Sequence, residues 1–288
     1  MTKKKFPLLI ILPALIIVGF TIVYPIIRTF LYSLQYYTLT EPEKSQWIGF
    51  KNYKKVLMSP DFHRALVNSI TILLIVMVLG LLFSMMVALI LNQRGKLTPF
   101  LTAIAIIPWA LPPIVNGIIW KFIFFPGYGL FNKILMNIGL VDRPILFTTH
   151  RFLFLAVIAI VVTWRIVPFS AIVILANLQN IPKDYYEAIT LEGSTRFQMF
   201  RRITLPLLLP SLGVVLINLT TTAINVFDEI IAMTGFQYEN QTLLVYNYSH
   251  TFQFLDFGLG STISYVIMMI AGIFGYYYVK NMTVEKVY

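Results

Sequence analysis

Long runs of apolar residues, separated by short polar segments, dominate this chain. A helix needs about 20 consecutive, mostly apolar residues to cross a bilayer. Six stretches meet that requirement, so the pattern predicts six transmembrane helices in an all-α membrane protein. The predicted spans are residues 7–31, 66–91, 99–125, 152–178, 206–231 and 261–278. Together they make residues 1–288 a single predicted transmembrane domain.

Two features modify this pattern. Pro108, Pro112 and Pro113 lie inside the third predicted span and Pro168 inside the fourth, and each is expected to kink its helix by removing a hydrogen bond. The first apolar run follows the basic residues 3–5, as a secretory signal would. It is longer than a signal's apolar region and no A-x-A cleavage site follows, so we interpret it as a retained helix.

Composition fits lipid as the solvent. Hydrophobic residues make up 58% of the chain, charged residues only 12%, and the mean hydropathy is +0.79. The net charge of +10 is spread in short groups between apolar runs, which argues against nucleic-acid binding. The absence of cysteine excludes disulfides and thiol chemistry. His63, His150 and His250 are far apart in sequence, so we expect no metal site.

Basic residues in short loops suggest an orientation. The short segment 92–98 holds Arg94 and Lys96, whereas the loop 232–260 holds no Lys or Arg. Short cytoplasmic loops carry the excess of basic residues in membrane proteins. We therefore expect both termini in the cytoplasm. In this orientation the basic residues on the cytoplasmic side are Lys3, Lys4, Lys5, Arg94, Lys96, Lys183, Arg196, Arg201, Arg202, Lys280 and Lys286.

The outer-face segment 32–65 contains a stretch, residues 47–61, in which aromatic and basic residues alternate with apolar ones at roughly helical spacing. This pattern is typical of an amphipathic helix that lies on a membrane surface. An ordered polar loop anchored at the interface by Trp47 explains it equally well, so both interpretations stay open.

The loop 181–206 differs from the other loops because it carries helix signals. Pro182 suits the first turn of a helix, and Asp184 and Glu187 suit its positive N-terminal end. A contact face then follows at i, i+3, i+4 and i+7, made by Tyr185, Ala188, Ile189 and Glu192.

A second short helix is predicted directly after the first. Gly193 permits a sharp turn with positive φ, and Ser194 is expected to cap the new helix, on which Phe197, Phe200 and Arg201 share a face. The loop is therefore a predicted helix–turn–helix elbow. A loop so structured, on the cytoplasmic side of a lipid-buried protein, indicates a docking surface.

The same loop resembles the EAA loop of ABC importer permeases, in which Glu-Ala-Ala, three residues, Gly, nine residues and Ile-x-Leu-Pro follow one another. The matching positions are Glu187, Ala188, Gly193, Ile203, Leu205 and Pro206. Ile189 replaces the second alanine, and Glu192 stands where Asp is usual. Further short matches, such as Tyr24-Pro25, Asn68 and residues 107–109, resemble sugar permeases of the maltose-transporter type. Residues 236–241 depart from that family, which often has Gly-Gly-Pro there.

This resemblance implies a type I ABC importer permease fold with a cytoplasmic coupling helix that docks on a separate ATPase. The residues it assigns to ATPase coupling are Tyr185, Glu187, Ala188, Ile189, Glu192, Gly193 and Phe197. The implied partners are a second homologous permease, an ATP-binding-cassette ATPase dimer and an extracytoplasmic solute-binding protein, in a prokaryotic inner membrane.

ATP and Mg²⁺ are expected on the partner ATPase, and no cofactor or catalytic residue is expected in this chain. A phosphate-binding loop needs G-x-x-x-x-G-K-[ST]. The only Gly-Lys pair, Gly95-Lys96, is followed by Leu97 and lacks the upstream glycine.

Polar residues within the spans are candidates for a substrate path, because they are costly in lipid and usually face a cavity. The candidates are Arg165, Asn218, Asn225, Asp228 and Glu229. Asn218 and Asn225 are seven residues apart and are expected to share a helical face. Hydrogen bonding between helices, or an Arg165–Asp228 pair that locks the bundle, would explain the same residues.

Other functions remain possible at this point. A secondary transporter or channel would also have polar residues in its spans, but would not need the elbow. A membrane enzyme would need a catalytic cluster, and the spans contain none. Within the importer family, the solute could be a sugar, glycerol phosphate, an amino acid or a metal.

Overall fold

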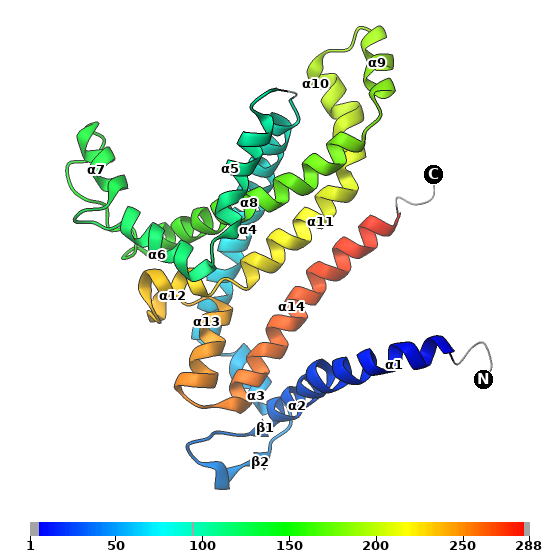
Figure 1. Ribbon diagram of the computed structural model, residues 1–288. Helices are drawn as coiled ribbons and strands as arrows, with labels where there is room; N and C mark the ends of the chain where they lie inside the picture. The colour runs from blue at the N-terminus through cyan, green and yellow to red at the C-terminus, as the bar shows by residue number, and fades with distance from the viewer. Residues whose placement is uncertain (1–5, 94, 285–288) are drawn as a thin grey trace. The chain divides into compact units, whose positions relative to one another are not determined.

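A computed structural model describes residues 6–93 and 95–284 of the chain, with side chains for residues 10–93 and 95–280, and is almost entirely helical (Figure 1). Five continuous helical segments are long and apolar enough to cross a membrane: Ile10–Ser33, Pro60–Leu91, Arg151–Asn180, Arg196–Thr234 and Phe257–Lys280. A broken helix pair supplies the sixth candidate. Several basic residues used to predict orientation, Lys3, Lys4, Lys5, Arg94 and Lys286, lie outside the described residues.

The third predicted span, residues 99–125, is not one kinked helix. It consists of α5 (Thr98–Ala110) and α6 (Pro113–Ile123), which meet at an angle of 97°. Leu111 and Pro112 between them are extended, with ψ of 132° and 140°. A residue that precedes proline is disfavoured in the helical region, so two successive prolines end α5 instead of bending it.

Two π turns adjust the helices where proline follows. The turn η1 (Gly19–Val23) joins α1 (Phe6–Val18) to α2 (Tyr24–Ser33), and η3 (Phe200–Thr204) leads into α11 (Leu205–Ile224). In both places proline is the second residue of the next helix and cannot donate a backbone hydrogen bond. The wider turn lets the residue before proline donate to the carbonyl five positions back.

The chain divides into two compact units. Unit 1 comprises Met1–His63 and Val245–Met269, and contains the antiparallel pair β1 (Gln35–Tyr36) and β2 (Gln46–Trp47), with Gln35 opposite Trp47. Its other short elements are η2 (Pro42–Lys44), α3 (Lys51–Leu57) and η5 (Ser249–Gln253). Asn52 is buried on α3 and donates to the carbonyls of Ser33 and Gln35, which fastens α3 to the end of α2. The outer stretch 47–61 therefore contains one seven-residue helix, α3, between β2 and the start of α4 (Pro60–Leu91). Its place at a membrane surface stays a prediction.

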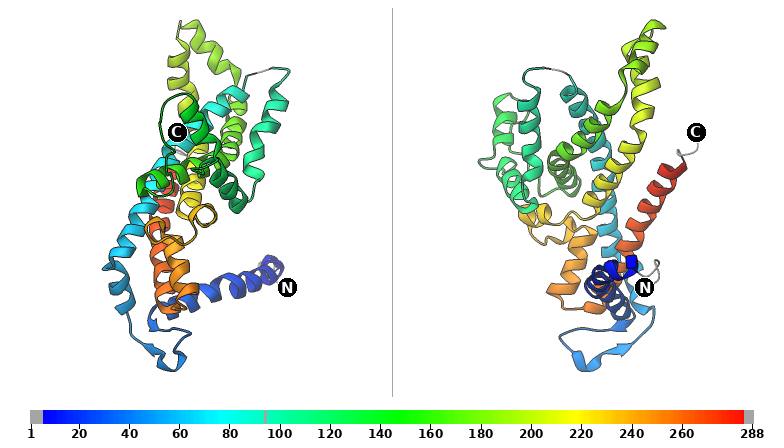
Figure 2. Two further views of the ribbon diagram at one scale, coloured as in Figure 1. Left: turned by 90° about the vertical axis from the view of Figure 1, so that its left-hand side faces the viewer. Right: turned by 45° about the vertical axis from the view of Figure 1, so that its right-hand side comes forward.

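Unit 2 comprises Arg64–Leu244 and Ile270–Tyr288. Its centre is α8 (Arg151–Asn180), which packs against α5 and α11, and α6 packs against α12 (Asp228–Thr234) (Figures 1 and 2). The shorter elements of this unit are α7 (Leu130–Asn137), α9 (Lys183–Leu191), α10 (Arg196–Met199) and η4 (Tyr238–Asn240). Three helices contribute residues to both units: α4 (Pro60–Leu91), α13 (Leu243–Tyr248) and α14 (Phe257–Val284).

The contact between α6 and α12 is close because it is made at a glycine. A Cβ atom on Gly117 would lie 2.7 Å from the Cβ of Ala232 and 2.9 Å from the Cα of Glu229. Any larger residue would separate the helices, so Gly117 fixes the position of α12 and of the charged residues at its start.

A buried asparagine holds the loop after α12. Asn68 on α4 is fully buried and donates to the backbone carbonyls of Glu239 and Gln241, at 3.0 and 2.8 Å. Arg151, at the start of α8, donates its Nε to the amide oxygen of Asn68 at 2.7 Å. These bonds satisfy the buried amide and fix the loop on the unit's framework.

Candidate functional site

The elbow, residues 181–206, begins with a helix that ends in a local hydrogen-bonded turn. The last turn of α9 is closed by bonds from Gly193 N to Thr190 O and from Ser194 N to Ile189 O, at 3.0 and 3.4 Å. Gly193 has φ of +74°, so the turn is left-handed as the sequence predicted. This is the Schellman arrangement, in which glycine avoids the steric cost of positive φ.

The second helix of the elbow has a different cap from the one predicted. Thr195, not Ser194, is the N-cap of α10. Its hydroxyl accepts from Gln198 N at 3.3 Å, while the Gln198 side chain accepts from Thr195 N at 2.8 Å. Ser194 is used by the turn itself, and the reciprocal bonds of a capping box require a Gln or Glu three residues after the cap. That residue exists only for Thr195.

The two faces of the elbow have different environments. Tyr185, Glu187, Ala188 and Glu192 are exposed, and so are Gly193 and Phe197. Ile189 is the exception among the predicted coupling residues, because it is buried and holds α9 in place. Tyr186 assists through a 3.1 Å hydrogen bond between its hydroxyl and that of Thr204 in η3.

Leu191 was not predicted to belong to this surface, yet 91% of it is exposed at the end of α9. Its spacing of three residues from Ala188 could have revealed it. Apolar side chains displayed beside carboxylates on a fixed helix form a surface suited to a protein partner.

The second site lies where the fifth span is interrupted. Asn225 ends α11, Val226 and Phe227 are not helical, and α12 starts at Asp228. Thr242 Oγ1 donates to the freed carbonyl of Val226 at 3.1 Å, and Asn225 Nδ2 to Thr221 O at 2.9 Å. A cavity of about 250 Å³ opens beside this break, and we call it the polar cavity. It is lined by Pro113, Arg165, Thr221, Thr222, Asn225, Val226, Asp228 and Glu229.

An ion pair forms one wall of the polar cavity. Arg165 Nε lies 3.1 Å from Glu229 Oε1, and the side chains are only 16% and 3% exposed. The ion pair considered as an alternative, Arg165 with Asp228, is thus replaced by Arg165 with Glu229, because the first turn of α12 directs Glu229 toward α8. The carboxylate of Asp228 lines the cavity instead.

The two candidate asparagines are not brought together. Asn225 lines the polar cavity, but Asn218 lies on α11 outside it, with its amide oxygen buried and without a hydrogen-bond partner among the described residues. Asn218 lies two helical turns before Asn225, which is the C-cap of α11, and does not reach this cavity. Four of the five substrate-path candidates thus meet at one cavity.

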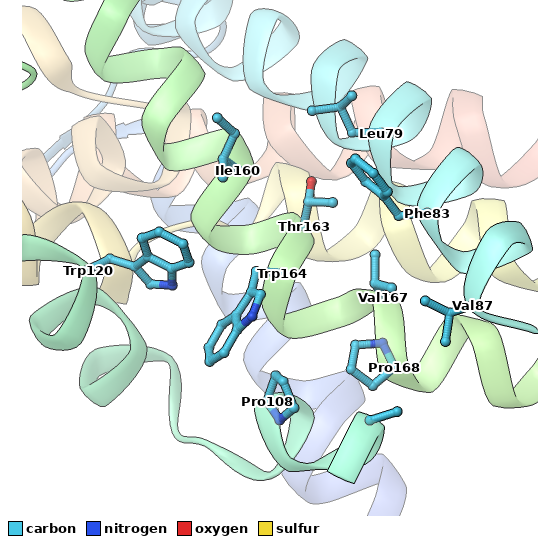
Figure 3. A pocket seen from close by; sticks show the side chains of 11 residues that line it. Leu79, Phe83, Val87, Pro108, Trp120, Ile160, Thr163, Trp164, Val167 and Pro168 are labelled. Atoms are coloured by element: carbon cyan, nitrogen blue, oxygen red, sulfur yellow. The ribbon is translucent and has the colours of Figure 1, made fainter. Parts of the chain in front are cut away.

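A second cavity in unit 2 has an almost entirely apolar wall. It measures about 390 Å³ and lies between α4, α5, α6 and α8 (Figure 3). Ten of its eleven lining residues are aliphatic, aromatic or proline, among them Trp120, Trp164, Pro108 and Pro168. The exception is Thr163, whose hydroxyl, like Trp120 Nε1, has no partner among the described residues. This apolar cavity offers few groups to a polyhydroxylated solute, unlike the polar cavity.

The sequence as a whole matches known transport proteins. Residues 62–286 match the family described as binding-protein-dependent transport system inner membrane component. The chain belongs to this family. The trehalose/maltose transport system permease protein MalF of Thermococcus litoralis is 37% identical, over 96% of this chain and 94% of the relative. The sulfoquinovosyl glycerol transport system permease protein SmoG of Agrobacterium fabrum is 34% identical, over 93% and 87%.

Solved structures support the family fold. A bacterial ABC transporter involved in the import of the acidic polysaccharide alginate contains a chain that superimposes with a TM-score of 0.83 at 23% identity, covering 99% of this chain and 97% of that one. A second structure, of the alginate transporter with a periplasmic protein bound to an alginate pentasaccharide, gives 0.80 at 24% identity, covering 96% and 93%. The predicted family and the type I importer permease fold are confirmed. Members of this family are inner-membrane transport components, so the chain is a transporter subunit.

Proposed function

We propose that this chain is the membrane-spanning permease of an ATP-driven importer for a neutral sugar. The observation that carries the proposal is the presence, on α11, of the exposed elbow at one end and the polar cavity at the other. The proposed partners are a second homologous permease, an ATPase dimer that supplies ATP and Mg²⁺, and an extracytoplasmic solute-binding protein. Both termini and the elbow are proposed to face the cytoplasm.

The elbow is proposed to dock on the ATPase. Its exposed carboxylates, Glu187 and Glu192, lie beside the apolar side chains of Tyr185, Leu191 and Phe197. Closure of the ATPase dimer would then pull on α9. Because η3 joins the elbow directly to α11, this displacement reaches the spans as a rigid-body movement.

The polar cavity is proposed to contact the solute. Its walls offer the hydroxyls of Thr221 and Thr222, the amide of Asn225 and the carboxylate of Asp228, all of which bond well to sugar hydroxyls. Interrupted helices that free backbone groups at a cavity are a common way to build a transport site.

Charge favours a neutral solute over glycerol phosphate. One guanidinium, on Arg165, faces two carboxylates, on Asp228 and Glu229, so the cavity carries excess negative charge. In a medium of low dielectric constant an anion would be repelled strongly. MalF is named for the neutral disaccharides trehalose and maltose, whereas SmoG is named for sulfoquinovosyl glycerol, which carries a sulfonate, so the choice of a neutral solute rests on the charge of the cavity and not on the relatives.

Uptake into liposomes tests the proposal. The chain is reconstituted with its permease partner, ATPase and binding protein, and ATP-dependent uptake of radiolabelled maltose, trehalose and glycerol 3-phosphate is measured. Losing one solute hydrogen bond, in Asn225→Ala, should lower sugar uptake about tenfold. The exposed Asn137→Ala is the matched control and should leave it unchanged. Uptake of glycerol phosphate without sugar uptake would refute the proposed solute.

Orientation is tested separately. The chain has no cysteine, so a single Thr195→Cys gives a clean label. A reagent that cannot cross the membrane should fail to label it in intact cells and should label it after lysis. Labelling from outside would refute the proposed topology.

A further inference from the structure

The segment between α6 and α8 folds into a small structure of its own. The rings of Phe124, Phe131 and Phe147 pack together, with centroids 4.9 to 5.5 Å apart. Asn132 on α7 is fully buried, donates to Ile145 O at 3.1 Å and accepts from Ile145 N at 2.8 Å. The inner face of α7 is thereby fixed to its own loop, and the outer face is set in a defined direction.

That outer face is apolar and uncovered by the described residues of unit 2. Leu130, Ile134 and Ile138, spaced by four residues, are 60%, 46% and 62% exposed. Lys133 and Asn137, also exposed, lie along one edge of this stripe at helical spacing. The helix is thus amphipathic on its outer half, with an apolar centre and a polar margin.

The stripe is preceded along the chain by a similar apolar surface on α6, the second half of the broken helix pair. On α6, Ile114, Ile118 and Phe122 are exposed with the same spacing. Phe125 and Tyr128 follow at the junction with α7 and stack at 4.2 Å. Tyr is one of the residues enriched where a protein passes from hydrocarbon to headgroups. The exposed surface therefore runs from α6 onto α7.

Charge identifies the medium that faces α7. Residues 121–143 contain the bases Lys121, Lys133 and Arg143 against a single acid, Asp142. Lys133 lies on α7 beside the apolar stripe, and a helix with this arrangement suits a membrane surface with anionic headgroups. The loop precedes α8, whose thirty residues span about 45 Å before the elbow starts. The loop thus belongs to the leaflet opposite the elbow.

We propose that α7 lies in the surface of this opposite leaflet, with Leu130, Ile134 and Ile138 among the upper acyl chains and with Lys133 and, from the following loop, Arg143 at anionic phosphates. The helix would then brace the end of α6, which packs on α12 beside the polar cavity. The proposal depends on membrane insertion and not on the identity of the solute.

Spin labels test it in the assembled transporter. Because the chain has no cysteine, nitroxides are placed at Ile134→Cys and, as the matched control one position away on the polar margin, at Lys133→Cys. The transporter is incorporated into nanodiscs of phosphatidylcholine with phosphatidylglycerol. Accessibility is measured to oxygen, which partitions into lipid, and to a water-soluble nickel chelate. The Ile134 label should respond several-fold more to oxygen than to nickel, and the Lys133 label should show the reverse preference.

Two results would overturn the proposal. Poor access of both reagents to the Ile134 label would mean that the sister permease or the binding protein covers the stripe. Strong nickel access would mean that α7 faces water. The phosphatidylglycerol dependence gives an independent measurement. Removing this lipid should reduce the oxygen preference of Ile134, and the double variant Lys133→Ala/Arg143→Ala should abolish that lipid dependence.

Discussion

The elbow and the break beside the polar cavity both interrupt helical structure, and they lie at opposite ends of α11. The elbow joins it through η3, and the break at residues 225–227 follows its last turn. The elbow is held by bonds within its own sequence, from Gly193 to Thr190 and between Thr195 and Gln198. The break is held by Thr242, fifteen or more residues away, and by the ion pair of Glu229 with Arg165.

This difference explains what each region can do. An interruption that satisfies its own backbone groups can stand in water and offer its side chains to a partner. An interruption that borrows bonds from other helices must stay inside the bundle, where it leaves a polar space. The same helix therefore carries a surface for a protein at one end and a space for a small molecule at the other.

The largest expected effect is at the cavity. In Arg165→Met the carboxylate of Glu229 stays buried without its partner, which should cost about 3–5 kcal/mol of stability. Thermal unfolding of the purified chain in detergent measures this loss. The double variant Arg165→Met/Glu229→Leu should recover most of it, and the exposed Arg202→Met should lose almost none. A fully stable Arg165→Met would show that the break does not depend on the ion pair.

A substitution in the elbow should lower the stability of the chain less and should mainly impair the coupling of ATP hydrolysis to uptake. Gly193→Val places a β-branched residue at φ of +74°, with a strain of about 1–3 kcal/mol. We expect a chain that inserts and pairs with its sister permease, yet binds the ATPase weakly or fails to couple hydrolysis to uptake. Gly139→Val is the matched control, since Gly139 has φ of +71° and also has open space around it. Equal loss of coupling in both variants would contradict the role of the elbow.

A smaller effect on stability should distinguish Thr195 from Ser194 as the N-cap of α10. Thr195→Ala removes a capping box and should cost about 1 kcal/mol of local stability, seen as faster amide exchange in α10. Ser194→Ala should change exchange there much less, because the Ser194 backbone and not its hydroxyl closes the turn. The reverse ranking would restore Ser194 as the cap.

The smallest effect lies in unit 1, outside both regions. Burial lowers the pKa of the His250 imidazole below its ordinary value, with Lys55 acting in the same direction and Asp256 and Asp61 opposing it. The unfolded chain then binds the proton more readily, so stability should fall as the pH drops below about 6.5. Unfolding temperatures between pH 5 and 8 should show this slope in the wild type. The slope should shrink in His250→Leu and remain in the exposed His150→Leu.

Local signals in the sequence predicted the main features of the elbow, although they placed the cap of the second helix one residue too early. Pro182, Gly193 and the acids of α9 predicted its two helices and its left-handed turn, because those residues act on their immediate neighbours. The break at residues 225–227 has no proline or glycine to announce it. It could not be predicted, since Thr242 and Arg165 reach it only after the chain has folded.

In the third span the sequence did contain the signals, but their effect on the helix could not be predicted. Pro108, Pro112 and Pro113 were visible, but whether a proline kinks or ends a helix depends on what satisfies the carbonyls that it frees. The sequence also could not decide between Asp228 and Glu229 as the partner of Arg165, because the two acids are adjacent and only the direction of α12 distinguishes them.

The manner in which Asn68 and Arg151 hold the loop after α12 has a consequence for its variation. Asn68 bonds to the backbone carbonyls of residues 239 and 241 and uses none of their side chains. The exposed side chain of Glu239 can therefore be exchanged while the path of the main chain is kept, whereas Gln237 accepts a bond from Asn240 Nδ2 and the Tyr238 ring lies under the Arg64 guanidinium. In residues 236–241 this chain departs from the sequence common in sugar permeases. Because the anchoring bonds go to the main chain, exposed side chains of this loop can change during evolution without loss of its anchor.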